Sequence, residues 1–366
     1  MVSEIVFHLG DPKTGSTSIQ DTLRTENWIC PQTRIIYPAR INHIDLAKSL
    51  APEAAFWAKS FKFRGVARRI SGSDADIAVI SAEYFNRVDP KVLQAAIHKY
   101  LPKYADTIRL VAYVRPHADR LVSAFAERVK VGYFTGTLPE LHASTKRTGT
   151  FMYNDRFLAW RAVFGARFTL RPMIRSELLH RCVVEDFLNF TFNGADFQLV
   201  EKIESNKSLS LEDLAMIREL HLVLRTKSHL EKTRTSVGLN MGRILASMPT
   251  QTGTKLRLPE SLVQDVIETY ALDAKRLDDA FFSGTPMTQA LMAARDNSTA
   301  VVQSIKAEDN FDPNQLRAIW AWRTLTLKLL EVSPWQVSKK FKGLREIELI
   351  ERAERLGHKR QRLEGP

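Results

Sequence analysis

The sequence predicts an α/β fold, with helices on both sides of a central parallel sheet, followed by a helical C-terminal region. Two patterns predict this fold. Up to about residue 205, short apolar runs typical of strands alternate with stretches of helical periodicity. Beyond that point the strand signals fade and long helical patterns take over. A chain of 366 residues, 44% of them hydrophobic, provides enough core for one large domain or two.

The expected strands of the first half are short apolar runs. The run 77–80 is continuously apolar rather than alternating, as in a strand covered on both faces of a parallel sheet. Helical spacing follows the first and third runs, and Gly165 would end a further helix. We therefore expect strands at 4–9, 77–80, 108–114 and 167–170, and helices from 16, over 118–129 and over 153–164.

The second half predicts helices at 211–224, 260–282 and 313–330. Gly284 and Pro286 stop a helical pattern that had run unbroken since Pro259, so we expect a boundary there. Residues 339–366 carry nine Lys or Arg against five Glu and few apolar anchors, which is typical of a solvated helix or of a contact with an anionic surface. The expected units are an α/β domain over 1–284 and a helical, basic extension over 285–366.

Composition limits the class of protein. The 53 Lys and Arg exceed the 41 Asp and Glu by 12, which suits a polyanion, a phosphorylated ligand or an acidic membrane face, although solubility alone also explains it. Two cysteines exclude a disulfide framework and suit a reducing compartment. No apolar run approaches the ~18–20 residues of a membrane span, and the chain starts with a strand-like run rather than a leader. We expect a cytoplasmic protein, at most peripheral to the inner face of the membrane.

The strongest local signal is the loop between the first strand and the first helix. Gly10 and Gly15 have the spacing of a nucleotide triphosphatase loop, but Ser16 stands where that motif needs lysine, and Lys13 lies three residues earlier. Such a loop directs backbone N–H groups and the positive helix end toward one point, which suits phosphate or sulfate oxygens. The loop therefore predicts an anion site that differs from that of the triphosphatases.

Two motifs together resemble the sulfotransferases that use 3′-phosphoadenosine 5′-phosphosulfate (PAPS). Residues 12–18 are similar to the family's 5′-phosphosulfate loop, and residues 113–116 with Ser123 are similar to its 3′-phosphate motif. The segments 81–85, 153–165, 186–188 and 206–210 resemble the bacterial, carbohydrate-sulfotransferase-like branch, so the likeness spans roughly residues 3 to 283. The resemblance implies a three-layer P-loop-like fold that binds PAPS and releases 3′-phosphoadenosine 5′-phosphate (PAP).

Chemistry and resemblance together assign roles to the residues of these motifs. In sulfuryl transfer an acceptor oxygen attacks sulfur in line with the departing phosphate oxygen, so we expect the ammonium of Lys13 beside that leaving oxygen. Arg115 follows a strand at its carboxyl end, where open α/β sheets bind ligands, and the resemblance implies that it binds the 3′-phosphate with Ser123. The resemblance also implies cofactor contacts for Thr14, Gly15, Ser16, Thr17 and Ser18.

Two residues compete for the role of proton acceptor. Glu83 follows a predicted strand, where a carboxylate can face the acceptor hydroxyl, and it matches the glutamate of several carbohydrate sulfotransferases; the alternative is an ion pair that shapes the loop. His8 lies two residues before Gly10 and needs little pKa adjustment, but a hydrogen-bonded core histidine is the competing interpretation. The resemblance implies a carbohydrate or glycolipid hydroxyl as acceptor. Because the histidines lack ligand spacing, we expect no metal centre.

Two other functions stay open. A small-molecule kinase would need magnesium ligands, and Asp74, Asp76 and Asp89 are the carboxylates near the second predicted strand. A basic, non-enzymatic module would bind nucleic acid or acidic lipid through the tail, although we expect no specific nucleic-acid partner. The oligomeric state is left open.

A second basic stretch precedes the run 77–80. Arg64, Arg68 and Arg69 lie close to Phe61 and Phe63. The stretch favours one exposed face of a helix over buried aromatic side chains, and binding of an acidic or sugar substrate is the alternative.

Overall fold

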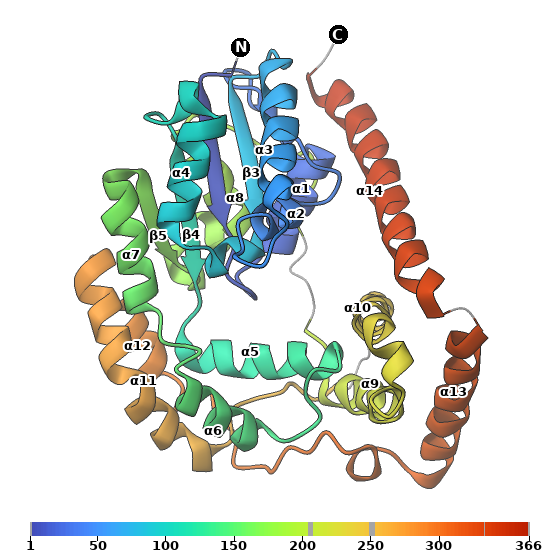
Figure 1. Ribbon diagram of the computed structural model, residues 1–366. Coiled ribbons are helices and arrows are strands. Elements are labelled where there is room, and N and C mark those ends of the chain that lie inside the picture. The colour runs from blue at the N-terminus through green and yellow to red at the C-terminus, as the bar shows by residue number, and fades with distance from the viewer. Residues whose placement is uncertain (1, 204–207, 249–252, 333, 365–366) are drawn as a thin grey trace.

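A five-stranded parallel sheet with strand order β2-β3-β1-β4-β5 forms the centre of the computed structural model (Figure 1). The structure describes residues 2–203, 208–248, 253–332 and 334–364. The strands are β1 (Glu4–Leu9), β2 (Ile35–Ile36), β3 (Ile77–Ala82), β4 (Arg109–Val114) and β5 (Phe168–Pro172).

Alternate strand residues form two separate apolar layers, because successive side chains point to opposite faces of a sheet. Phe7 and Ile80 belong to one layer, and Val6 and Val79 to the other. The first layer is covered by α3 (Phe56–Ser71), α4 (Pro90–Tyr100) and α7 (Asn154–Phe164), and the second by α1 (Ser16–Thr25) and α8 (Val183–Thr191). All residues of β3 are buried, as the continuous apolar run predicts. The expected three-layer α/β class is confirmed.

The strand order sets the position of the candidate site. β1 pairs with β3 on one side and with β4 on the other, and Leu9 is in register with Ala82. The three segments that follow these strands therefore leave the sheet at the same edge. In open α/β sheets ligands bind at such a switch point.

The helix that follows β4, α5 (His117–Lys130), lies at this edge. Figure 1 shows α5 lying across the sheet's carboxyl edge, beneath it in this view. A Cβ at Gly238 of α10 (Glu231–Ser247) would lie 1.9 Å from the Lys130 carbonyl oxygen, so only glycine lets α10 lie directly against the end of α5. The other helices that precede the last two of the chain are α2 (Ile44–Lys48), α6 (Leu138–Thr148), α9 (Leu211–Leu224), α11 (Glu260–Phe281) and α12 (Pro286–Met292).

Two long helices end the chain: α13 (Pro313–Val332) and α14 (Pro334–Glu364). α14 returns along α1 and α10 (Figure 1). Leu349 and Leu356 of α14 are 1% exposed, Arg345 forms an ion pair with Asp21, and Arg360 Nη1 lies 3.2 Å from Glu26 Oε2. The tail is therefore a helix that docks on the body of the protein through two buried leucines and these ion pairs, while most of its other described side chains stay exposed or half-buried.

The predicted elements agree closely with the structure. The four predicted strands and the six predicted helices are present, with ends shifted by at most two residues. The two-residue strand β2 is too short to produce a periodic signal, and it was not predicted. Within the described residues, no helix is long and apolar enough to cross a membrane.

The boundary at Gly284 stays a prediction. The Asp278 carboxylate of α11 accepts hydrogen bonds from the backbone N–H groups of Met287 and Thr288, each at 2.8 Å, so α12 is attached to the preceding helix. Met287 and Leu291 also belong to the same apolar cluster as the sheet. In the resembling segment 206–210, Asn206 and Lys207 lie outside the described residues.

Candidate active site

The loop between β1 and α1 has the tight geometry that its glycines require. Gly15 has φ of 82° and Lys13 has φ of 71°, both in the left-handed region. A Cβ at Gly10 would lie 2.7 Å from Ser16 Oγ and 3.1 Å from Glu83 Cα, so the loop runs directly against the end of β3. A Cβ at Gly15 would lie 2.6 Å from a methyl group of Val183. These close approaches explain why both positions are glycine.

The first turn of α1 has the features of an anion-binding site. Gly15 is its N-cap, no side chain of the described residues caps the helix, and its first turn has no acidic residue. Thr14 Oγ1 donates to the Asp11 carbonyl at 2.6 Å, which holds the loop closed. Ser16 Oγ is buried without a hydrogen-bond partner in the described part of the chain. Thr17 is exposed and Ser18 is half-buried. An anion at this helix end would satisfy free backbone donors and the positive end of the helix dipole.

Lys13 is held by a carboxylate on α5. Its Nζ lies 3.2 Å from Glu127 Oε2, and Lys130 Nζ lies 2.6 Å from the same oxygen. Burial lowers the pKa of Lys13, as does the charge of Lys130, whereas Glu127 counteracts both effects. Burial raises the pKa of Glu127, but the two lysines outweigh burial and hold this pKa below its usual value. Lys13, Glu127 and Lys130 therefore form one cluster of ion pairs centred on the Glu127 carboxylate.

The two sequence motifs meet at one point. Arg115 Nη1 donates to the Lys13 carbonyl at 3.1 Å and to Ser123 Oγ at 3.3 Å. Arg115 therefore connects the loop after β1 with the helix after β4. The structure brings together Lys13, Arg115 and Ser123, which lie far apart in the sequence.

Glu83 lies at the same edge, in the 3-10 turn Glu83–Arg87 that follows β3. Burial raises the pKa of its carboxyl group, and the charge of Glu127 raises it further, while Lys13 and Arg120 act in the opposite direction. No hydrogen-bond donor from the described residues reaches the Glu83 carboxylate. A carboxylate with a raised pKa and free lone pairs has the properties of a general base.

His8 lies in the core. Its side chain is fully buried, Nδ1 is 2.8 Å from Ser81 Oγ, and its ring packs against Tyr113 and Phe187. Burial lowers the pKa of His8 to about 3. The structure therefore places His8 inside the α1 and α8 layer, and the proton-acceptor role fits Glu83 better.

Several residues of the site were not predicted. The Asp11 carboxylate accepts hydrogen bonds from Asn86 at 3.0 Å and Arg156 at 3.1 Å, and Arg120 lies 4.0 Å from its other oxygen. The sequence does contain a signal for the site residues of α5. Arg120, Ser123, Glu127 and Lys130 follow one another at spacings of three and four, so they share one face of α5.

The carboxylates that a kinase would need for magnesium are engaged elsewhere. Asp74 accepts a hydrogen bond from Arg34 at 2.6 Å, Asp76 accepts one from the Arg34 backbone N–H, and Asp89 caps α4 through the Lys91 N–H. No cluster of three or more metal-ligating side chains occurs among the residues that the structure describes. The donors at the sheet edge are cations, hydroxyls and amides, which suit an anion.

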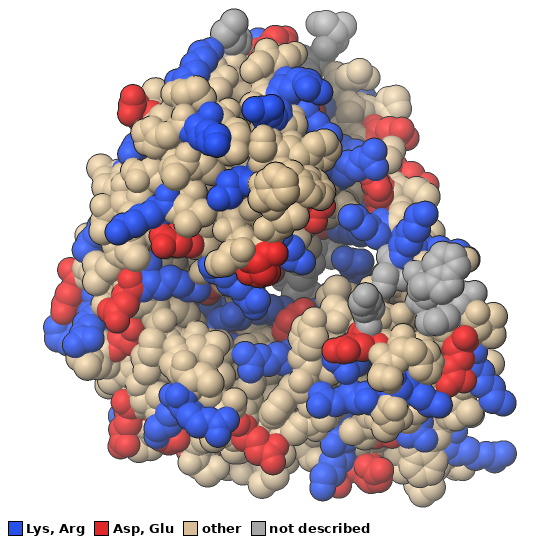
Figure 2. Space-filling model, viewed as in Figure 1, with Lys and Arg blue, Asp and Glu red and all other residues tan. Residues whose placement is uncertain are grey.

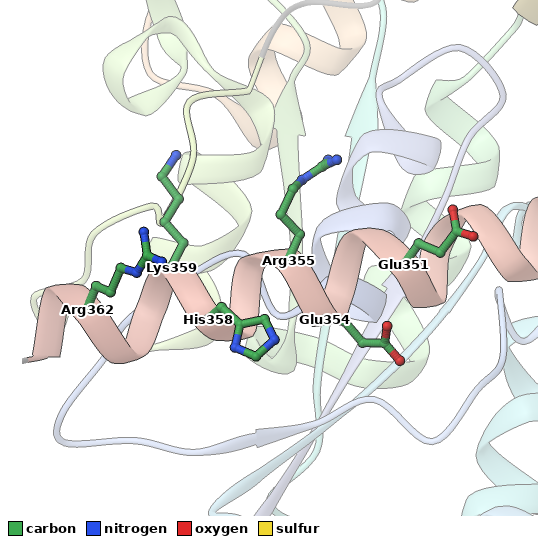
Figure 3. A pocket seen from close by; sticks show the side chains of 6 residues that line it. All are labelled: Glu351, Glu354, Arg355, His358, Lys359 and Arg362. Carbon is green, nitrogen blue, oxygen red and sulfur yellow. The ribbon is translucent and has the colours of Figure 1, made fainter.

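The molecular surface agrees with this description. Figure 2 shows a hollow near the centre of the viewed face, at the level between the sheet and α5, with Lys and Arg side chains on several sides. A separate pocket of about 560 Å³ lies along α14, and Figure 3 shows that its lining side chains all come from that one helix. None of the loop residues lines this pocket, so it is not part of the candidate site.

Comparisons with known proteins give little support beyond this geometry. No protein-family model and no curated protein matches the chain. Among solved structures, the chain is similar to a sulfotransferase from Alicyclobacillus acidocaldarius, with 12% sequence identity and a TM-score of 0.42 over 78% of this chain and 98% of the other. At this level of similarity, function has to be inferred from the residues of the site.

Proposed function

We propose that this protein is a PAPS-dependent sulfotransferase that transfers a sulfuryl group to a hydroxyl. One observation supports this most strongly: Arg115, which contacts Ser123, also donates a hydrogen bond to the Lys13 carbonyl, so the Arg115–Ser123 pair lies directly beside the glycine loop. A ligand with two separate anionic groups can contact the pair and the loop at once. PAPS carries a 5′-phosphosulfate and a 3′-phosphate, so it has this property.

The residues present fit such a ligand. The loop offers the first-turn amides of α1, and the buried Ser16 hydroxyl lacks a partner within the described residues. Arg115 and Lys13 supply cations, and their backbone and side-chain contacts hold them in one site. An arginine fork suits a terminal phosphate, whereas the compact lysine ammonium suits a single oxygen where charge develops.

The chemical step needs only groups that this site provides. An oxygen lone pair of the acceptor hydroxyl forms a bond to sulfur, and the bond between sulfur and the 5′-phosphate oxygen breaks with its electron pair remaining on that oxygen. The Glu83 carboxylate takes the hydroxyl proton, and Lys13 stabilises the leaving oxygen. PAP and the sulfated acceptor are the products. For the acceptor we propose a carbohydrate or glycolipid hydroxyl, on the basis of the resemblance around Glu83.

Binding of PAP tests the proposal directly. We expect PAP to raise the melting temperature without magnesium, and labelled sulfate to pass from PAPS to members of a panel of glycans and lipids. Lys13→Ala should lower turnover by about 1,000-fold. Lys275→Ala, which removes an equally charged residue paired with Asp279 on α11, should leave turnover unchanged. Stabilisation by Mg-ATP alone, with no response to PAP, would instead establish a kinase.

A further inference from the structure

The N-terminal half of α3 exposes aromatic side chains to an unusual degree. Phe56 is 96% exposed, Trp57 58% and Phe61 67%. Large apolar groups that lie together on a surface commonly mark an interaction site. Lys62 Nζ lies 6.0 Å from the centroid of the Phe61 ring, but all three rings stay largely exposed, and the packing of the described residues does not account for this exposure.

The same helix is strongly basic. Between Phe56 and Ser71 it contains five Lys or Arg and no Asp or Glu. Trp57, Phe61, Arg64 and Arg68 are all exposed and follow at spacings of four, three and four, so they form one stripe. Within the described part of the chain, the guanidinium groups of Arg64 and Arg68 form no ion pair or hydrogen bond, whereas that of Arg69 donates to the Pro38 carbonyl. The stripe joins apolar rings to free cations.

The fold places the aromatic end of this stripe at the sheet edge that carries the candidate site. α3 leads into β3, so its C-terminus lies near the start of that strand and its N-terminus near the strand's end (Figure 1). α2 links the two regions: Asp45 lies 3.6 Å from Lys62 of α3, and Lys48 lies 5.8 Å from the Tyr84 ring, next to Glu83. The aromatic end of α3 therefore lies at the same edge of the sheet as the turn that begins at Glu83, with α2 in contact with both.

We propose that the N-terminal half of α3 docks the protein on an anionic membrane surface. Aromatic rings enter the boundary between headgroups and acyl chains, and nearby Lys and Arg bind anionic lipids. Arg64 lies seven residues beyond Trp57, about 10 Å along the helix, so when the helix enters by its N-terminus the rings reach the acyl boundary while the Arg64 guanidinium stays at the lipid headgroups. Trp57 and Phe61 meet at an interplanar angle of 77°, so the two rings do not form one continuous flat face.

The tail is less suited to this task. Its basic residues Arg345 and Arg360 pair with Asp21 and Glu26 of α1 and its loop, and Arg352 lies 3.7 Å from Glu201. These contacts hold α14 against the body of the protein. If the proposed function is correct, docking by α3 implies that the acceptor hydroxyl belongs to a lipid and reaches Glu83 from the membrane.

Vesicle co-sedimentation of the full chain tests docking independently of catalysis. We expect binding to vesicles of phosphatidylcholine and phosphatidylglycerol in equal parts, and not to phosphatidylcholine alone. The triple variant Phe56→Ser, Trp57→Ser, Phe61→Ser should lower vesicle affinity by about 100-fold or more. Arg64→Ala and Arg68→Ala should each lower it by about fivefold.

A matched control removes equally exposed apolar side chains elsewhere. Leu325→Ser, Leu329→Ser, Val332→Ser acts on α13, where these residues are 59%, 64% and 81% exposed, and should retain vesicle binding. The α3 proposal is wrong if the wild type does not bind anionic vesicles, if the α3 variant binds as well as the wild type, or if the α13 variant loses binding instead. Retention on a dextran sulfate column gives a further comparison. The proposal is also wrong if the α3 variant loses this retention but keeps vesicle binding, because α3 would then bind a polysaccharide.

PAP titration of the same preparations separates this proposal from the proposed function. Because the three rings are exposed, the α3 variant should keep its melting temperature and its PAP affinity. Vesicle binding without any PAP binding would leave docking intact and remove the sulfotransferase. PAP binding without vesicle binding would support the sulfotransferase and reject membrane docking by α3.

Discussion

Replacement of Glu127 by glutamine should tighten the binding of PAP, although it removes a charged residue from the site. Glu127 Oε2 lies 3.2 Å from Lys13 Nζ, so it competes for the cation that an anionic ligand needs. Glutamine keeps the shape of the side chain and removes its charge. Lys13 is then free to turn to the ligand without breaking an ion pair.

The size of the effect follows from the distance and the exposure. Two unit charges 3.2 Å apart attract by about 1.3 kcal/mol in bulk water and by about 5 kcal/mol at an effective dielectric constant of 20. The Lys13 and Glu127 side chains are 34% and 28% exposed, so solvent screening favours the lower part of this range, about 1–2 kcal/mol. This corresponds to about a 5- to 30-fold lower Kd for PAP.

Isothermal titration of PAP at two salt concentrations measures the effect. The gain should shrink as salt increases, because salt screens the charges. Asp279→Asn on α11 is the matched control, since it changes the net charge equally but breaks the distant pair with Lys275. The reasoning is refuted if Glu127→Gln leaves PAP affinity unchanged or weakens it, or if Asp279→Asn produces the same gain. The pKa of Glu127 is lowered in the folded protein, so its charged form contributes stability above the usual carboxyl range, and the variant should melt earlier at neutral pH.

Three further predictions concern the other residues of the site and the core. Glu83→Gln should lower turnover by about 100- to 10,000-fold with little change in PAP affinity. Because burial raises the pKa of Glu83, turnover of the wild type should increase as pH rises through that raised pKa. Steady-state rates of both proteins, measured across pH, check these two expectations. Arg115→Ala should raise the Kd for PAP by about 10- to 100-fold through loss of charge-assisted hydrogen bonds, as measured by titration. Burial lowers the pKa values of His8 and His43 from 6.5 to about 3, so both side chains stay neutral in the folded state above that pH. The free energy of unfolding should therefore fall as pH decreases from 6.5 toward 3. Denaturant titrations that show no such fall would contradict this expectation.

The strands and the loop could be predicted because their signals are local. A continuously buried run such as 77–80 predicts a covered strand, and the glycine spacing with Lys13 predicts an anion loop. Both signals depend on near neighbours in the chain. The short strand β2 has only Ile35 and Ile36, too few residues for any period to appear.

The partners of Lys13 could not be predicted in the same way. The apolar face of α5, with Leu121, Phe125 and Val129, identifies the side that packs on the core. It does not identify what the opposite face meets. The meeting of Glu127 with Lys13 depends on the strand order, which places β4 and its helix beside β1 although β2 and β3 lie between them in the sequence.

The contacts of the tail likewise could not be predicted from the sequence. Its high charge favoured a solvated helix, because charged residues are usually exposed. Leu349 and Leu356, seven residues apart, were a weak signal of a buried stripe. The ion pairs with Asp21 and Glu26 exist only because α14 returns to lie along α1.

The amino-acid sequence by itself determined the fold class and the residue types offered to an anion: a glycine loop with Lys13, an arginine after a strand, and a glutamate after another. Only the tertiary structure decided that these groups share one edge, that Glu127 already holds the lysine, and that His8 lies in the core. The physical reason is that propensity and periodicity act between near neighbours in the chain. The energy of a charge or hydrogen bond depends instead on separation and burial in space, which the order of the strands sets.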